Sequence, residues 1–127
     1  KASDKVLAFE GPEKINSLEL ETFPYEGPRQ RVNYTTREFS AVCPFSGLPD
    51  LGTVSIDYVP RNKCVELKSL KYYYLSYRNV GIYQEAVTAK IYKDLFQVLE
   101  PYEMKVTVTY QTRGGIDTVC SVSNADQ

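Results

Sequence analysis

The sequence contains no histidine among its 127 residues. Without this side chain, the chain by itself cannot form a Ser-His-Asp triad, a Cys-His pair or a histidine-ligated metal site. We therefore expect no bound metal. If the chain uses a cysteine nucleophile, a carboxylate must do the proton transfer that histidine performs in many other enzymes.

Long hydrophobic runs and an excess of one charge are also missing. No segment is apolar over the length that crosses a membrane, and no signal peptide is evident. The 15 lysines and arginines nearly balance the 16 aspartates and glutamates, which gives a net charge of −1. This balance argues against a protein that binds nucleic acid directly, but leaves room for a local basic patch around one phosphorylated ligand.

The cysteines are few and irregularly spaced. Cys43, Cys64 and Cys120 form neither a disulfide framework nor a paired zinc-ligand pattern. We therefore expect a reducing, cytoplasmic location. Cys64 follows a turn and Cys120 lies in an apolar strand, so both are predicted to act as small buried hydrophobic residues.

Residues 1–30 differ from the rest in their prolines and glycines. Gly11-Pro12, Pro24 and Gly27-Pro28 interrupt a polar stretch, which predicts an extended N-terminal lead-in that wraps the core. No linker or repeat follows. Residues 31–127 are therefore predicted to form a single domain of ordinary hydrophobic content.

This domain has strand patterns at both ends and helical patterns in the middle. Strands are predicted at 31–42, 53–59, 104–111 and 116–122, the last two joined by a turn at 113–115. Helices are predicted at 66–78 and 82–99, closed by Pro101, with these residues facing inward: Leu67, Leu70, Tyr74 and Tyr77 in the first, and Tyr83, Val87, Ile91, Leu95 and Val98 in the second. The order β-β-α-α-β-β predicts an α+β fold, with a four-stranded antiparallel sheet and two helices on one face. Its exposed sheet edges favour self-association.

The segment Cys43-Pro-Phe-Ser-Gly-Leu-Pro-Asp50 is the most informative part of the sequence. Two prolines and a glycine predict a shaped loop at a strand end. Cys43 lies seven residues before Asp50, so the loop brings a thiol near a carboxylate. Backbone amides between them would stabilise negative charge, and amide or cationic neighbours would lower the pKa of the thiol. A buried, purely structural Cys43 remains the alternative from these residues alone.

Three other places carry candidate binding groups. In Glu66-Leu-Lys-Ser-Leu-Lys-Tyr-Tyr73, Lys68 and Lys71 lie on one helix face and suit a phosphate, although a solvated helix face is the simpler interpretation. Arg113 on the flexible Gly114-Gly115 turn offers a further cation. Glu85, near a helix start, is suited to accept hydrogen bonds from an amidine-like edge of a base.

Together these segments resemble the QueF family of NADPH-dependent 7-cyano-7-deazaguanine reductases in queuosine biosynthesis. The resemblance extends from about Phe23 to Gly115 and rests on both motifs, on Arg78-Asn79 and on Arg113-Gly-Gly. It is closest to the short, single-module form. It implies a tunnelling fold (T-fold) and a homo-oligomer with active sites at subunit interfaces.

The resemblance also implies residue roles. Cys43 would attack the nitrile carbon to form a covalent thioimide, and Asp50 would supply and relay protons. Two NADPH molecules would then complete the reduction to 7-aminomethyl-7-deazaguanine. Four residues would bind the substrate: Glu85, Gln84, Glu66 and Ser69. Four would bind the cofactor, often from a neighbouring subunit: Lys68, Lys71, Arg113 and Gly114.

One position departs from the family pattern. Many members carry histidine immediately before the substrate-binding glutamate, whereas this chain has Gln84, which cannot exchange a proton near neutral pH. Two alternatives therefore stay open: a QueF-like archaeosine synthase that adds ammonia to a tRNA-borne nitrile, and a non-catalytic purine-binding T-fold protein. The first lacks the lysine segment that this chain has, and the second does not need Cys43 and Asp50.

Overall fold

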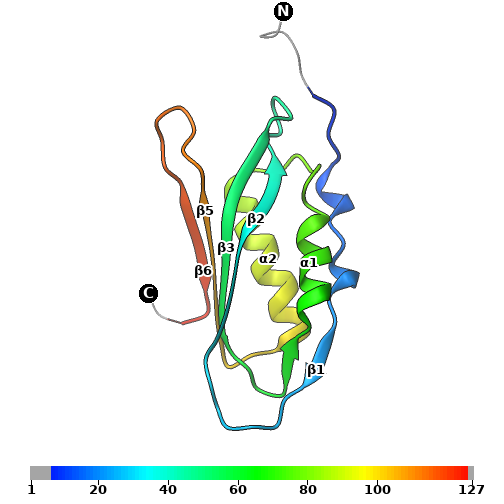
Figure 1. Cartoon of the computed structure of the whole chain (residues 1–127), viewed down its shortest axis with the longest axis vertical. Coiled ribbons are helices and arrows are strands. Elements are labelled where there is room, and N and C mark those ends of the chain that lie inside the picture. The colour runs from blue at the N-terminus through cyan, green and yellow to red at the C-terminus, as the bar shows by residue number, and fades with distance from the viewer. Residues whose placement is uncertain (1–6, 126–127) are drawn as a thin grey trace, which may run out of the picture.

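The protein, seen in a computed structural model whose described residues are 7–125, consists of a twisted sheet covered on one face by two helices (Figure 1). The α+β prediction is confirmed. The strands and helices are β1 (Thr22–Pro24), β2 (Val32–Val42), β3 (Pro49–Val59), β4 (Lys63–Val65), α1 (Leu67–Leu75), α2 (Gln84–Leu99), β5 (Glu103–Tyr110) and β6 (Val119–Ser123). No described helix is long and apolar enough to cross a membrane.

Four strands form one antiparallel sheet in the order β2-β3-β5-β6. The alternating residues pair across the centre of this sheet: Val54 lies opposite Val108, and Ile56 lies opposite Val106. All four side chains are fully buried under the helices. Because side chains alternate between the faces of a strand, this register buries every second residue and leaves the intervening ones at the other face.

The second strand begins earlier than the sequence predicts. Pairing of β3 with β2 starts at Pro49 opposite Val42, not at Thr53. Proline is tolerated at the first residue of a strand, where its missing N–H costs no ladder hydrogen bond. Asp50 is consequently a strand residue opposite Ala41 and lies just past the loop predicted to contain it.

The helices follow their predicted ranges, with two exceptions in their inward faces. Tyr83 stands immediately before α2 and is 56% exposed, and Leu67 begins α1 and is also 56% exposed, so both predicted core positions are wrong. Both residues are exposed because they stand at the start of their helices, ahead of the turns that pack on the sheet. Glu100 ends α2 in the left-handed conformation (φ 46°), and Pro101 follows, as expected.

A buried polar network joins the two helices. The Tyr73 hydroxyl donates to Asp94 (2.7 Å) and shares a 2.7 Å hydrogen bond with the Tyr77 hydroxyl. Lys90 pairs with the other Asp94 oxygen at 3.0 Å. Burial of Asp94 (5% exposed) is thereby matched by partners on both oxygens.

The N-terminal segment packs closely against the domain. Within residues 7–30, β1 pairs with β4 to form a second, two-stranded sheet, and Ile15 and Leu20 join the hydrophobic core. The segment therefore contributes core residues to the fold. A domain boundary at residue 30 stays a prediction.

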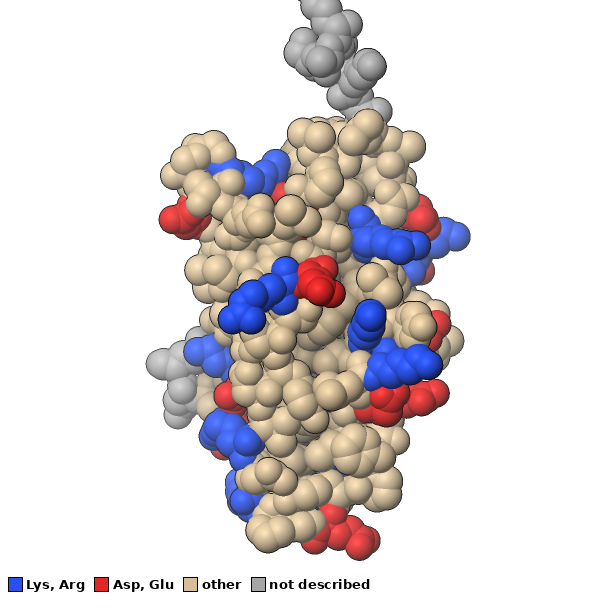
Figure 2. All heavy atoms as spheres, viewed as in Figure 1, with Lys and Arg blue, Asp and Glu red and all other residues tan. Residues whose placement is uncertain are grey.

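Most of the face shown in Figure 2 is uncharged, with scattered positive and negative side chains and no extended surface of one sign. This distribution agrees with the net charge of −1.

Candidate active site

Cys43 lies in a tight loop between β2 and β3. Its backbone N–H donates to the carbonyl of Leu48 (2.9 Å), and its own carbonyl accepts from Gly47 (2.8 Å). Gly47 has φ +72°, a conformation that glycine adopts without steric cost. An added Cβ there would lie 2.3 Å from the backbone oxygen of Leu7, so two separate constraints require glycine.

This loop surrounds the Cys43 thiol with hydrogen-bond donors. The backbone amides of Ser46 and Phe45 lower the pKa of the thiol to about 7, with burial opposing them and smaller contributions from the Ser46 hydroxyl and Arg113. Cys43 is 7% exposed. At neutral pH about half of such a thiol is thiolate, the nucleophilic form.

Asp50 is a buried carboxylate held by one cation. Its side chain is 3% exposed and accepts a hydrogen bond from Arg113 at 2.7 Å. Burial raises the pKa of Asp50 above its usual value, and the charge and hydrogen bond of Arg113 limit that rise. A carboxyl group in this state is suited to hold and release a proton.

Arg113 reaches Asp50 from the hairpin between β5 and β6. Arg113 and Ile116 exchange backbone hydrogen bonds of 3.0 and 2.9 Å across the turn. Gly114 and Gly115 between them have φ values of +57° and +76°. The turn therefore depends on glycine, and it places the arginine at the end of the sheet where β2 and β3 are joined (Figure 1).

The start of α2 lies at the same end of the domain. Val42 and Gly81 form a bridge, and Ile82 donates to the Val42 carbonyl (3.2 Å), so the chain enters α2 directly beside the Cys43 loop. Gln84, the first residue of α2, is half-buried, and Glu85 is exposed on the first turn.

Tyr110 is a polar residue of this region that the sequence pattern does not reveal. Its hydroxyl approaches the Gln84 carbonyl at 3.4 Å. Burial raises the pKa of Tyr110, and Cys120, Asp50 and Glu85 raise it further, so these groups lie around one hydroxyl. The pattern of β5 marks Tyr110 only as another inward residue, because alternation does not distinguish a core tyrosine from one bordering a site.

The N-terminal segment braces this end of the domain. Leu7 donates to the carbonyl of Ser46 (2.9 Å), within the cysteine loop. Glu10 forms two backbone bonds to 79–81, accepting from Gly81 (2.8 Å) and donating to Asn79 (2.7 Å). Residues 7–10 therefore link the loop to the segment that leads into α2.

The residues of the Glu66–Tyr73 motif lie along α1, away from the Cys43 loop. Glu66 caps α1 by accepting from the backbone of Ser69 (3.1 Å) and Lys68, while the Ser69 hydroxyl accepts from Glu21 (2.9 Å). The bonds to Glu66 begin the helix, and the bond to Ser69 attaches the residue that precedes β1. After its last turn, α1 continues into residues 79–81, which lie beside Cys43. Glu66 stands at the other end of this nine-residue helix, which is about 13 Å long, so the helix separates it from Cys43.

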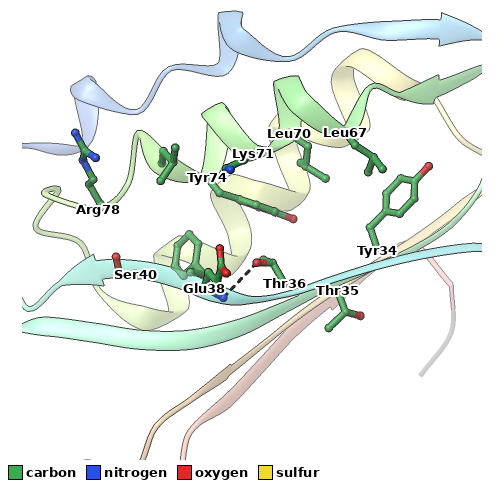
Figure 3. Close-up of a pocket in the computed structure, with 12 residues that line it drawn as sticks. Tyr34, Thr35, Thr36, Glu38, Ser40, Leu67, Leu70, Lys71, Tyr74 and Arg78 are labelled. Atoms are coloured by element: carbon green, nitrogen blue, oxygen red, sulfur yellow. Dashed lines mark hydrogen bonds between the residues drawn. The ribbon is translucent and has the colours of Figure 1, made fainter.

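Lys71 borders a groove of about 250 Å³ between α1 and the edge strand β2 (Figure 3). Leu70, Tyr74 and Phe39 supply its apolar wall, and Arg78 supplies a second cation. The Tyr74 hydroxyl is buried and has no hydrogen-bond partner within residues 7–125. The six predicted residues Cys43, Asp50, Gln84, Glu85, Arg113 and Gly114 thus lie at one end of the domain, while Glu66, Lys68, Ser69 and Lys71 lie along α1.

The described cysteines are all free, and residues 7–125 contain no group of three or more His, Cys, Asp or Glu side chains placed to hold a metal ion.

Comparison with known proteins shows the family of the chain. Residues 49–127 match the family model described as QueF-like protein. Proteins of Thermotoga maritima and Thermotoga petrophila are each 48% identical over 99% of this chain and 93% of their own, and one of Caldicellulosiruptor bescii is 53% identical over 85% of this chain and 84% of its own. All three are named NADPH-dependent 7-cyano-7-deazaguanine reductase.

A solved structure bears on the fold. The apo crystal structure of the archaeosine synthase QueF-Like matches with a TM-score of 0.67 and 24% identity, over 77% of this chain and 95% of that one. At that identity the likeness concerns the fold alone, and it confirms the tunnelling fold. With identities near 50% over nearly the whole chain, and a family model covering residues 49–127, this chain belongs to the QueF family.

Proposed function

We propose that this protein is an NADPH-dependent 7-cyano-7-deazaguanine reductase, which reduces the nitrile to 7-aminomethyl-7-deazaguanine in queuosine biosynthesis. The observation that carries the proposal is a thiol of pKa about 7 at the end of β2, next to a buried carboxylate. Relatives of that name at 48% identity over 99% of the chain support the reaction class.

The first step is addition of the Cys43 thiolate to the nitrile carbon. A C–S bond forms, one C–N π bond opens, and the nitrogen takes a proton that Asp50 relays from solvent, which gives a thioimide. The raised pKa of Asp50 suits it to hold that proton. The amides of Ser46 and Phe45 stabilise the thiolate before attack and again when the C–S bond breaks.

Reduction needs two hydrides, which NADPH supplies when bound. Hydride addition to the thioimide carbon would allow the C–S bond to break, with Cys43 leaving as thiolate. A second addition would reduce the resulting imine, and protons relayed through Asp50 would complete the amine. The overall balance is a nitrile, two NADPH and two protons giving a primary amine and two NADP⁺.

The chain carries groups that fit a phosphorylated cofactor. Lys68 and Lys71 are exposed and lie three residues apart on one face of α1. Lys71 also borders the groove lined by Tyr74, whose buried hydroxyl has no hydrogen-bond partner among residues 7–125. Since α1 begins far from Cys43 in the same chain, we propose that α1 of a neighbouring copy completes each site in a homo-oligomer.

Glu85 and Gln84 are the proposed substrate contacts on the Cys43 side. Glu85 is exposed at the start of α2, where its carboxylate is free to accept hydrogen bonds from a guanine-like edge. Gln84 positions the ligand without proton transfer, which leaves Asp50 and water to carry the protons. Glu66 and Ser69 contribute from the neighbouring copy in this proposal.

The test is to mix the protein with 7-cyano-7-deazaguanine, record intact mass and absorbance, and then add NADPH. A covalent adduct that is absent in Cys43→Ala and retained in Cys120→Ala, followed by oxidation of two NADPH per substrate, is the expected result. Cys120 is the matched control because it is a half-buried free thiol on β6.

Two other outcomes contradict the proposal. An adduct that ignores NADPH but yields to ammonia on a tRNA-borne base indicates an amidine-forming enzyme. Binding without any adduct, under conditions in which the Cys43 thiol is free, indicates a purine-binding protein.

A further inference from the structure

Two groups that become negative, the Cys43 thiol and the Asp50 carboxyl, are buried where β2 meets β3, since Val42 pairs with Pro49 and Ala41 with Asp50. Cys43 is 7% exposed and the Asp50 side chain is 3% exposed. A thiolate and a carboxylate in such a place oppose each other, since burial and like charge both disfavour ionisation. A nearby cation is therefore needed if both are to be ionised.

Arg113 is placed to be that cation. Its Nη1 lies 2.7 Å from Asp50 Oδ1, and the guanidinium also lowers the pKa of the Cys43 thiol. The planar guanidinium has several donors and serves two acceptors at once, which a lysine ammonium does less well. Within residues 7–125, Arg113 is the only residue that forms an ion pair with Asp50.

The hairpin holds Arg113 without depending on the arginine side chain. The turn is closed by backbone bonds between Arg113 and Ile116 and by the two glycines at positive φ. The side chain is 49% exposed, so water reaches its outer side while Nη1 contacts the buried Asp50.

We propose that Arg113 is a positioning residue shared by Cys43 and Asp50, and that it allows thiolate and carboxylate to coexist in the resting site before any cofactor binds. This role of Arg113 extends the proposed function, because the use of the Cys43 thiolate in nitrile attack rests on that proposal. It differs from the phosphate-binding role that the family resemblance implies for the same residue.

Other ionisable groups around the pair come from three further elements. Tyr110 on β5, Glu85 on α2 and Cys120 on β6 form the neighbouring cluster, and Asp50 and Glu85 both act on Tyr110. None of these three carries a positive charge. They cannot replace Arg113, and any negative charge on them adds to the need for it.

The experiment follows alkylation of Cys43 by iodoacetamide from pH 5.5 to 9.5, resolved by peptide mass spectrometry, with no substrate or cofactor present. Arg113→Gln is expected to raise the midpoint of the profile by about half a pH unit, and Arg113→Lys by less. Asp50→Asn is expected to lower the midpoint, because Arg113 then serves the thiolate alone. Arg37→Gln, the same change at an exposed position on β2, is expected to leave the midpoint in place.

Opposite shifts in Arg113→Gln and Asp50→Asn support the inference, since a general loosening of the loop would not change sign. Should Arg113→Gln raise the KM for NADPH while its alkylation midpoint equals that of the unmodified protein, Arg113 is a phosphate ligand only and the inference is wrong.

The two proposals fail separately. Opposite midpoint shifts without a nitrile adduct would retain the role of Arg113 and reject the reductase. A nitrile adduct with unchanged alkylation midpoints would retain the reductase and reject the role of Arg113.

Discussion

Replacing Tyr73 by phenylalanine tests how strongly the buried network holds α1 to α2. The change removes one hydroxyl from a fully buried ring and leaves the ring itself in place. It deletes the 2.7 Å bond to the Asp94 carboxylate and the 2.7 Å bond shared with Tyr77. Asp94 keeps only its contact with Lys90.

The expected loss follows from these two bonds. A hydrogen bond to a carboxylate contributes about 1.5–3 kcal/mol and one between neutral groups about 1 kcal/mol, so Tyr73→Phe should cost about 3 kcal/mol. With an unfolding entropy of about 2.1 cal/mol/K per residue, the melting temperature of a chain of this size should fall by about 10 °C.

The assay is thermal unfolding followed by circular dichroism at one fixed protein concentration, because association would shift the melting temperature. Tyr72→Phe is the control: the same atom is removed from the next residue of α1, whose side chain is 48% exposed. That variant should melt within about 2 °C of the unmodified protein. Equal, small shifts in both variants would refute the assignment of stability to the network.

Three further predictions concern the site and the helix start. In the unmodified protein, the pH profile of Cys43 alkylation should have its midpoint near pH 7, because amide donors lower the pKa of the thiol to about 7. Reactivity is then lost as the pH falls through 7, since the thiolate becomes protonated. A midpoint above about pH 8.5, the value of an unperturbed thiol, would contradict this prediction. Gly47→Ala should destabilise the protein by about 1–3 kcal/mol and slow adduct formation at Cys43, whereas Gly114→Ala, also at positive φ but facing open space, should cost only about 1 kcal/mol. Glu66→Ala removes the cap of α1 and should lower stability by about 1 kcal/mol in a denaturant titration, with an unchanged midpoint speaking against the capping role.

Much of the fold was predictable because its elements carry clear periodicities. The alternation in β5 and the 3.6-residue pattern of α2 predict both elements to within a few residues. The errors occur at element ends. Tyr83 and Leu67 fit the apolar stripes but precede the helical turns that pack on the sheet, and a stripe does not reveal where packing begins.

The short pairing of β1 with β4 was missed for a related reason. Each strand has three residues, too few for a pattern, and they are about 40 positions apart in the chain. The same holds for the Tyr73–Asp94 contact, because a tyrosine in an aromatic run resembles its neighbours until the second helix is placed beside it.

The candidate site, like the fold, was predictable from the sequence only in part. The sequence by itself determined which chemical groups are present: no histidine, a thiol and a carboxylate seven residues apart, and a set of lysines and arginines in two motifs. Only the tertiary structure decided which of these groups meet. Arg113 bonds to Asp50 although the two are 63 positions apart in the chain. The register of β3 with β5, together with a two-glycine turn, brings the hairpin over the end of β2. The lysines of α1 remain on a separate face. Strand register and turn geometry are properties of the folded chain, so no local pattern of residues specifies that pairing.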